Sequence, residues 1–433
     1  MKNRALYIPL ITSIVSAFAL VILASPKTEI ETKPKEGAIR VLFLGHDSEH
    51  HNSNKYYPML AKGLGRDAIY FDYVTSVEEA LGDATFLGKF DALLLYANHG
   101  TITPNQWKNL KDYVEGGGGF VPVHCASWCF GNEPAFDQLV GGRFDSHKVG
   151  TFTSKVVDPQ HPAMEGVKEF EAWDETYKHK NHNEKDRQVL MVREVAGKDD
   201  NITEPEPWTW VRTQGKGRVF YTASGHDERV WKQPAFHQLL KAGILWSVGK
   251  ERKQSYEEFI AERAPLKYEK RGDIANYENR PEPLPYQFPL KAEDSMKYTQ
   301  APVGFRLELF ASEPDIINPI GLAWDERGRL WAAETVDYPN EMTPDRVGND
   351  KIKILEDTDG DGKCDKVTVF ADGLNIPTSL TFSRGGIIVA HVPDFLFLKD
   401  TDGDDKADVR EVLNTGWGTG DTHAGPSNLR YGF

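Results

Sequence analysis

Four histidines follow short apolar segments of the sequence, and imidazole is the side chain best suited to proton transfer or metal binding near neutral pH. The segments are RVLFLG, ALLLYAN, GFVPV and GRVFYTASG, and they lead to His46, His99, His124 and His226. In a doubly wound sheet the carboxyl ends of parallel strands form the edge where ligands bind. The four imidazoles are therefore expected along one edge, where they predict an acid–base or metal site.

The elements that must position these histidines alternate regularly along the first half of the chain. From Ile39 to about Lys250, short apolar runs are separated by amphipathic segments such as 105–117 and 234–249, with apolar residues at helical spacing. This alternation is typical of a parallel sheet covered by helices on both faces. We therefore predict an α/β domain over residues 38–250.

Two further histidines and two cysteines lie close to these strand ends. His50 and His51 follow the first strand and could either join the strand-end histidines or face solvent, and for His51 we favour solvent. Cys125 and Cys129 lie beyond the third strand, within GGGGFVPVHCASWCF. Cys125 could act as a nucleophile if a base were at hand, or it could fill the core as a small apolar side chain. The two cysteines could form a disulfide or remain free thiols.

Several motifs of this region together resemble the ThuA-like (trehalose-utilisation) family. They are GHDSEHH, YANHG, GGGGFVPVHCAS, LVGGRFDSHK, DPQHPAMEG, WDETY and GKGRVFYTASGHD, and they extend over about residues 38–250. The resemblance implies a flavodoxin-like, doubly wound parallel sheet, a divergent form of the class I glutamine-amidotransferase-like fold. It also implies a role in carbohydrate metabolism.

The resemblance also implies a set of site residues. In amidotransferase relatives a cysteine occupies a tight turn from strand to helix, whereas here His124 aligns with that position. The family motifs add His147, Glu175 and His226 to His124 as catalytic candidates, with Asp174 as the alternative carboxylate. A carboxylate between imidazoles can act as a base or bind a metal, so a divalent metal is possible in this domain. The residues expected to contact the substrate are His46, His99 and Tyr177.

Two acidic segments near the end of the chain have the spacing of a calcium loop. DTDGDGKCD and DTDGDDKAD place carboxylates at loop positions 1, 3, 5 and 9, where they can surround a hard cation. Gly362 provides the sharp turn in the first loop, but Asp405 replaces it in the second, so we expect weaker binding there. The alternative is an acidic surface turn. The predicted calcium ligands are Asp357, Asp359, Asp361, Asp365, Asp400, Asp402, Asp404 and Asp408.

These two loops belong to an internal repeat. They recur 43 residues apart within a region rich in short β-like runs and turns, a spacing typical of four-stranded propeller blades. We therefore predict an incomplete all-β propeller over 302–433. The charged, proline-rich stretch 251–301 is expected to be a linker.

The second region also resembles a known family. GFRLELFASEP, GLAWDERGRLWAAE, the two aspartate loops and GDTHAGPSNLRYGF resemble the start of the propeller domain of bacterial membrane-bound dehydrogenases, which are related to quinone-dependent sugar dehydrogenases. The resemblance implies a general base at His423 and a redox partner. The sequence contains no CxxCH motif, so haem is not assigned to this chain. A quinone is not assigned to it either, because no motif for one is identified.

Composition and the N-terminal segment restrict the function further. The net charge of −14 argues against nucleic-acid binding. Residues 1–25 combine two basic residues with a long apolar run, which predicts a signal peptide or an N-terminal membrane anchor. We therefore expect an exported protein, periplasmic or extracellular, that contacts the membrane only through this segment.

These observations favour an exported protein of carbohydrate metabolism. The ThuA-like domain would act on a sugar or keto-sugar by acid–base chemistry of histidine and glutamate, coupled to a sugar-dehydrogenase-like propeller. Two alternatives remain open. One is a non-catalytic carbohydrate-binding or anchoring module, and the other is a cysteine-dependent amide hydrolase that uses Cys125.

Overall fold

The computed structural model contains two compact units. The first is made of residues up to Leu60 and Tyr73–Ile260, and the second of Ala61–Asp72 and the residues from Ala261 onward. No helix in the described part of the chain is long and apolar enough to cross a membrane, and the predicted leader at 1–25 lies outside that part. The described residues are 37–198, 200–273, 285–339, 342–423 and 425–431.

An eight-stranded sheet has the strand order β2-β1-β3-β4-β12-β11-β10-β7, and all of its strands except β2 lie wholly within the first unit. Its strands β1, β3, β4 and β12 pair in parallel and are almost entirely buried and apolar, as the sequence predicts. The strands are β1 (Ile39–Leu44), β2 (Ile69–Val74), β3 (Ala92–Leu95), β4 (Gly119–Pro122), β7 (Lys155–Val156), β10 (Arg187–Arg193), β11 (Glu206–Gln214) and β12 (Gly217–Thr222).

The prediction of a wholly parallel sheet is wrong for one side of it. Strand β11 pairs antiparallel with both β12 and β10, and β10 pairs antiparallel with β7. The cause is local, because Gln214 pairs with Gly217 across a two-residue turn that contains Gly215 at φ 60°. Such a turn joins neighbouring antiparallel strands and leaves no room for a crossover helix. The unit is therefore an α/β domain with a mixed sheet.

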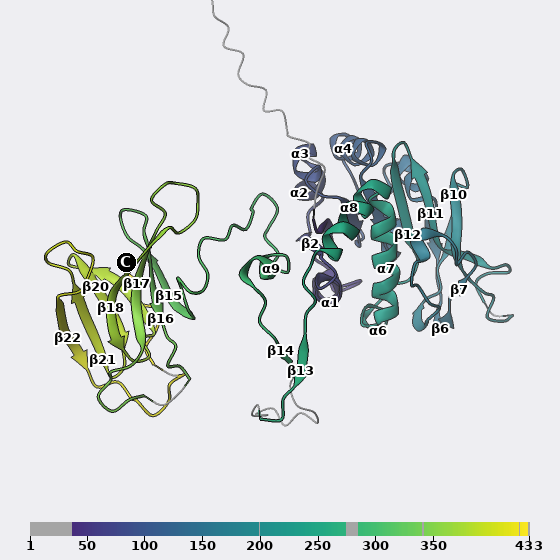
Figure 1. Ribbon diagram of the computed structural model, residues 1–433. Coiled ribbons are helices and arrows are strands. Elements are labelled where there is room, and N and C mark those ends of the chain that lie inside the picture. Colours follow the sequence, from purple (N-terminus) through teal and green to yellow (C-terminus); the bar gives the residue numbers. More distant parts are fainter. Residues whose placement is uncertain (1–36, 199, 274–284, 340–341, 424, 432–433) are drawn as a thin grey trace, which may run out of the picture. The chain divides into compact units, whose positions relative to one another are not determined.

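Helices flank this sheet, and their ends are encoded locally (Figure 1). Helix α4 begins with a capping box, in which Thr103 accepts a hydrogen bond from the Gln106 N–H and the Gln106 side chain accepts one from the Thr103 N–H. Helix α7 buries an apolar stripe against β4 and β12. The helices are α1 (Ser53–Gly65), α2 (Val77–Leu81), α3 (Ala84–Leu87), α4 (Pro104–Glu115), α5 (Pro134–Val140), α6 (Glu228–Trp231), α7 (Pro234–Ser247) and α8 (Lys250–Ala261).

Two short antiparallel pairs lie outside the main sheet and carry site residues. Strand β5 (Arg143–Ser146) pairs with β9 (Lys178–Lys180), and β6 (Val149–Thr153) pairs with β8 (Glu171–Glu175). His147 lies between β5 and β6, and Glu175 is the last residue of β8, opposite Val149. The turn between β5 and β6 therefore brings His147 to the end of the strand that carries Glu175.

The stretch 251–301, which the sequence predicts to be a linker, begins within α8. In that helix Arg252 Nε donates to Asp91 Oδ1 at 3.0 Å, and its Nη2 donates to the Ala38 carbonyl at 2.8 Å. The start of the stretch therefore belongs to the first unit. Further on it contains a pair of short strands, β13 (Tyr268–Lys270) and β14 (Pro285–Gln287), and the helix α9 (Ala292–Met296).

The second unit contains two antiparallel four-stranded sheets in sequential order, β15-β16-β17-β18 and β19-β20-β21-β22. Each aspartate loop joins the third and fourth strands of its sheet, so the sequence repeat corresponds to a structural one. The predicted all-β character is present, but the described strands do not establish a propeller. The strands are β15 (Pro319–Trp324), β16 (Leu330–Glu334), β17 (Asp350–Glu356), β18 (Lys366–Leu374), β19 (Ser379–Ser383), β20 (Gly386–His391), β21 (Asp394–Lys399) and β22 (Val409–Thr415).

Candidate functional site

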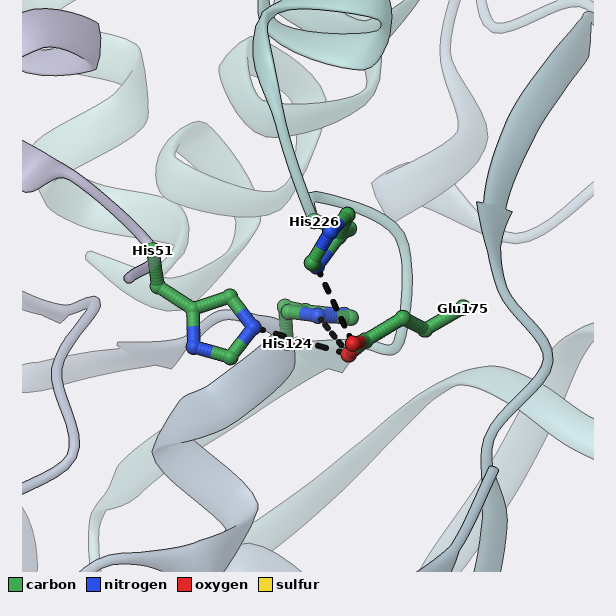
Figure 2. Close-up of side chains that lie close together, drawn as sticks. All are labelled: His51, His124, Glu175 and His226. Carbon is green, nitrogen blue, oxygen red and sulfur yellow. Dashed lines mark hydrogen bonds and ion pairs between the residues drawn. The ribbon is translucent and has the colours of Figure 1, made fainter. Parts of the chain in front are cut away.

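Three imidazoles surround one buried carboxylate at the carboxyl edge of the parallel strands. Figure 2 shows the side chains of His51, His124 and His226 pointing at Glu175. Glu175 Oε2 lies 3.1 Å from His124 Nε2 and 3.5 Å from His51 Nε2, and Glu175 Oε1 lies 3.2 Å from His226 Nδ1. The structure thus brings together three of the predicted catalytic residues and adds His51 to them.

His124 stands at a sharp turn from strand to helix. It lies two residues after the end of β4, begins the short 3₁₀ helix η1 (His124–Trp128), and has φ 48°, in the left-handed region. Gly225 lies against it, and a Cβ on Gly225 would come 3.3 Å from His124 Cβ. A non-glycine residue in left-handed backbone costs free energy and is found where a side chain must be aimed. His124 therefore has the local geometry that the resemblance implied.

His51 lies in the turn between β1 and α1, and the prediction that it is solvated is wrong, because it is only 5% exposed. Two contacts hold it in place. His46 Nε2 donates to the His51 carbonyl oxygen at 2.9 Å, and His51 Nδ1 lies 2.9 Å from Asn98 Oδ1. His46, one of the predicted substrate ligands, thus supports the backbone of a site residue.

Burial and hydrogen bonding set the charges of the cluster. Burial lowers the pKa of His124 to about 4, against the opposing effect of Glu175. Burial alone would raise the pKa of Glu175, but its contacts with the imidazoles of His124, His226 and His51 hold that pKa well below its usual range. Burial would also lower the pKa of His226, yet the Glu175 carboxylate raises it. Glu175 is therefore ionised among the imidazoles.

Asp174, the alternative carboxylate, does not face the imidazoles and has a structural role instead. It is 1% exposed, and its oxygens accept hydrogen bonds from the backbone N–H groups of Gly225 at 3.0 Å and His226 at 3.1 Å. Burial raises its pKa to about 7. Asp174 therefore holds the loop that carries His226, while its neighbour Glu175 faces the imidazoles.

The edge of the cluster is more open than its centre. His147 Nε2 lies 3.6 Å from Glu175 Oε1, and its side chain is 37% exposed. His50 is exposed too, with its ring 4.0 Å from that of His51. Tyr177, by contrast, is buried, and its ring stacks on that of His124 with the ring centroids 4.2 Å apart. A ligand from solvent would therefore meet His147 before it met Tyr177.

His99, the other predicted substrate ligand, is not among the four clustered residues. Its Nε2 donates to the Gly45 carbonyl at 2.9 Å, and its ring lies 6.3 Å from that of His46. Burial lowers the pKa of both His46 and His99. These two histidines therefore connect loops at the edge of the sheet, next to the cluster.

Cys125 and Cys129 are fully buried free thiols. Cys129 donates to the Ala97 carbonyl at 2.9 Å, and burial raises its pKa to about 12. Burial also raises the pKa of Cys125 well above its usual range. A buried thiol with a raised pKa is a poor nucleophile, so the geometry does not favour a cysteine hydrolase.

The two aspartate loops of the second unit gather their first three carboxylates. In each loop the ligand atoms lie within 4.8 Å of one another, in Asp357, Asp359 and Asp361 and in their repeat equivalents. The fourth carboxylates, Asp365 and Asp408, instead hold the hydroxyl groups of the threonines at loop position 2. Calcium binding stays a prediction. The equivalent cluster in the second loop is Asp400, Asp402 and Asp404.

His423 lies on the surface of the second unit. Its side chain is 67% exposed, and its Nδ1 is 3.0 Å from Asp421 Oδ1. It lines a pocket of about 870 Å³ together with Trp324 and Tyr338. The role of His423 as a general base stays a prediction.

Two family models match separate parts of the chain. Residues 40–247 match the family model described as trehalose utilisation (ThuA), and residues 291–433 match a model described as a domain of unknown function (DUF7133). The first unit therefore contains a ThuA-like domain, which supports a carbohydrate-related function. The match in the second unit names no dehydrogenase.

The chain is also similar to solved structures. One is a ThuA-like protein from Parabacteroides merdae, 19% identical, with 49% of this chain and 90% of that chain covered and a TM-score of 0.43. Another, from Bacteroides uniformis, is 20% identical, with 49% and 93% covered and a TM-score of 0.41. A search of curated proteins found no match.

Proposed function

We propose that the ThuA-like domain transfers protons on a sugar or keto-sugar at the cluster formed by His51, His124, Glu175 and His226. The observation that supports this most is the position of Glu175, which lies within 3.6 Å of four imidazole nitrogens when His147 is included. Proton transfer is the chemistry that such a set of side chains serves best. The sugar substrate comes from the ThuA-like character of the domain.

His147 is the proposed acid–base group that touches the sugar, because its imidazole is half-exposed at the edge of the cluster. In a keto-sugar it would take the proton from the carbon next to the carbonyl group, and the C–H electron pair would form the double bond of an enediol. The carbonyl oxygen would receive a proton from a water molecule in the same step, and it would give that proton back to the hydroxide when the keto group re-forms. Return of a proton to carbon completes the exchange without any oxidant.

Deuterium exchange tests this reaction directly. The full chain is incubated in D₂O with a keto-disaccharide or with the parent disaccharide, and exchange of carbon-bound protons is followed by NMR. We expect exchange only next to the keto group, and a loss of about 10²-fold or more in His147→Gln. His182→Gln, which changes an exposed histidine outside the cluster, serves as the control. Equal rates in both variants would contradict the proposal.

The exchange assay, together with a test for ammonia release, distinguishes the proposed function from a cysteine-dependent hydrolase. Cys125→Ala should keep the exchange rate of the wild type, because the thiol is buried with a raised pKa. Release of ammonia from an amide substrate that disappears in a folded Cys125→Ala variant would support the hydrolase instead. Circular dichroism of the variant shows whether it has folded.

A second candidate function, carbohydrate binding by the second unit, is favoured by the pocket of about 870 Å³. The Trp324 side chain there is 62% exposed, and Tyr338 and His423 lie at the same pocket with ring centroids 5.3 Å apart. Exposed aromatic rings beside polar groups suit the faces and hydroxyl groups of sugars. Sugar oxidation with His423 as base would in addition require a redox partner.

Binding of oligosaccharides measured by calorimetry tests the second candidate. Trp324→Ala should weaken binding by about tenfold, because it removes one exposed stacking surface. His423→Ala should abolish oxidation of a bound sugar if the dehydrogenase-like reaction occurs. Binding that is the same in wild type and Trp324→Ala would contradict a role for this pocket.

A further inference from the structure

We propose that His51, His124, Glu175 and His226 bind one divalent transition-metal ion of the zinc type. This inference shares its residues with the proposed function but stands on their geometry alone. It would assign Glu175 and the three imidazoles to the metal and leave His147, at the edge of the cluster, for proton transfer with a substrate.

The hydrogen bonds on the far sides of two imidazoles fix which nitrogen carries the proton. His124 Nδ1 lies 2.6 Å from the Ala223 carbonyl oxygen, which can only accept, so Nδ1 must donate. His51 Nδ1 lies 2.9 Å from the Asn98 side-chain oxygen, with the same consequence. In the neutral tautomer each ring then has a bare lone pair at Nε2. This is the arrangement of metal-binding histidines, whose second nitrogen donates to a carbonyl or carboxylate.

Both lone pairs point at a carboxylate oxygen. His124 Nε2 and His51 Nε2 lie 3.1 and 3.5 Å from the same atom, Glu175 Oε2. Lone pairs that face a carboxylate repel it unless a cation lies between them. His51 Nε2 and His226 Nδ1 are moreover buried without any hydrogen-bond partner. One metal ion would satisfy all of these atoms at once.

A protonated, positively charged His124 would be the alternative explanation for the close contacts between the imidazoles and Glu175. The ring is fully buried, where a charge is costly. A proton could in any case satisfy only one of the contacts to Glu175 Oε2. The metal accounts for both.

The distances between the candidate ligand atoms agree with those expected around one tetrahedral metal ion. Metal–nitrogen and metal–oxygen bonds of about 2.0–2.2 Å give neighbouring ligand atoms in a tetrahedral site a separation of about 3.4 Å. The contacts to Glu175 measure 3.1, 3.2 and 3.5 Å, and all four ligand atoms lie within 4.8 Å of one another. Small movements of the side chains would complete the coordination.

The ligand types indicate the class of metal. Imidazole suits zinc, copper, iron and nickel, whereas calcium and magnesium prefer oxygen ligands. The cluster offers three imidazole nitrogens and one carboxylate, and the nearby buried thiols Cys125 and Cys129 are not part of it. A zinc-type ion therefore fits this site, while the oxygen-only aspartate loops fit calcium.

Cobalt spectroscopy and zinc titration of the full chain test the metal site. The protein is stripped with a chelator, dialysed and supplied with excess Ca²⁺, so that the aspartate loops do not compete. We expect one Zn²⁺ per chain and visible absorption bands on addition of Co²⁺. His51→Gln should lower the Zn²⁺ affinity by about 10²-fold or more. His237→Gln, which changes a half-buried histidine bonded to the Trp231 carbonyl, should behave as the wild type.

Two results would overturn the proposal. One is the absence of both stoichiometric Zn²⁺ binding and Co²⁺ bands in the wild type, and the other is equal Zn²⁺ affinity in His51→Gln and wild type. If His51→Gln is unfolded by circular dichroism, His226→Gln gives the same comparison, since its side chain is partly exposed. Metal binding without sugar exchange would refute only the proposed function, and exchange in a protein that binds no metal would refute only the metal site.

Discussion

The two units present their carboxylates in opposite ways. Glu175 is 4% exposed, and imidazoles oriented by their own hydrogen bonds surround it. In the first aspartate loop, Asp357 stands near the surface and accepts hydrogen bonds from the backbone N–H groups of Gly360 at 2.6 Å and Gly362 at 2.9 Å. Residues from distant parts of the chain position the side chains of the buried site, whereas backbone N–H groups of the same loop position the carboxylate of Asp357.

This difference indicates how burial affects the affinity of a ligand cluster for an ion. Water can replace an ion at the exposed loop at little cost, so weak binding is expected there, in the range of about 10⁻⁴–10⁻³ M for extracellular modules. Glu175, His51 and His124 are buried, so an empty site would leave buried lone pairs facing a negative charge. We therefore expect tight binding in the first unit and weak binding in the second.

The largest expected effect comes from removal of the central charge. Glu175→Gln should lower the Zn²⁺ affinity by about 10³-fold, because loss of one partner from a buried charged site costs about 3–5 kcal/mol. Competition with a chromophoric chelator measures the affinity. Glu171→Gln, on the exposed end of the same strand, is the matched control. Retention of wild-type affinity in Glu175→Gln would remove the contrast between the two units.

Acidification should affect the second unit through a buried histidine. His391 is 2% exposed, and burial, with help from Arg346 and Arg410, lowers its pKa to about 4, while its Nε2 accepts the Asn375 N–H at 3.0 Å. Between pH 6.5 and 4 the unfolded chain binds a proton that the folded chain does not. Stability should therefore fall as the pH falls through this window, by up to about 3 kcal/mol.

Urea unfolding of the full chain at pH 7 and pH 4.5 measures this loss. His391→Gln should show a smaller difference between the two pH values, since glutamine does not titrate in this range. An identical loss in the variant would show that other groups, such as the first-unit histidines, cause the acid sensitivity.

A smaller effect is expected from the residue behind His51. Asn98→Ala removes the oxygen that faces His51 Nδ1 at 2.9 Å, so the ring loses the contact that fixes its tautomer. Changes of this kind typically cost about 10–100-fold in metal affinity. Asn105→Ala, on the exposed start of helix α4, is the control, and zinc titration is the measurement. No change in Asn98→Ala would mean that the tautomer is fixed in another way.

The smallest effect concerns the second aspartate loop. Asp405 adopts φ 62° where the first loop has Gly362 at φ 87°. Glycine carries no penalty in this conformation, whereas other residues pay about 1–2 kcal/mol. Asp405→Gly should therefore raise the Ca²⁺ affinity of this loop by about fivefold, as measured by calorimetry in an Asp357→Asn background. An unchanged or lower affinity would contradict this explanation.

The sequence predicted the α/β unit well because its strands are short, buried and bounded by turns. It also predicted from the strand ends that His124 and His226 belong to one site, whereas Glu175 was added to that site by the motifs of the ThuA-like resemblance. Strand ends converge at one edge of a parallel sheet, and this rule needs no knowledge of loop conformation. The rule did not distinguish His46 and His99, which also follow strands but turn to backbone carbonyls instead of Glu175.

The features that were missed depend on loop geometry. His51 enters the cluster because its own backbone has φ 52° and because His46 and Asn98 hold it, and none of this is visible in a hydrophobic pattern. Only the doubled histidine in SEHHNS hinted at it. The antiparallel strand β11 was missed because the two-residue turn at Gly215 resembles any other polar turn in sequence.

The cluster around Glu175 also joins segments that lie far apart in the chain. The turn after β1, the end of β4, the end of β8 and the loop after β12 each contribute one residue to it. An ion held by all four would act as a reversible cross-link and would remove loop-closure entropy from any state in which these segments separate. Amide hydrogen exchange in these loops should then slow together when the ion binds, since one bond network governs their opening.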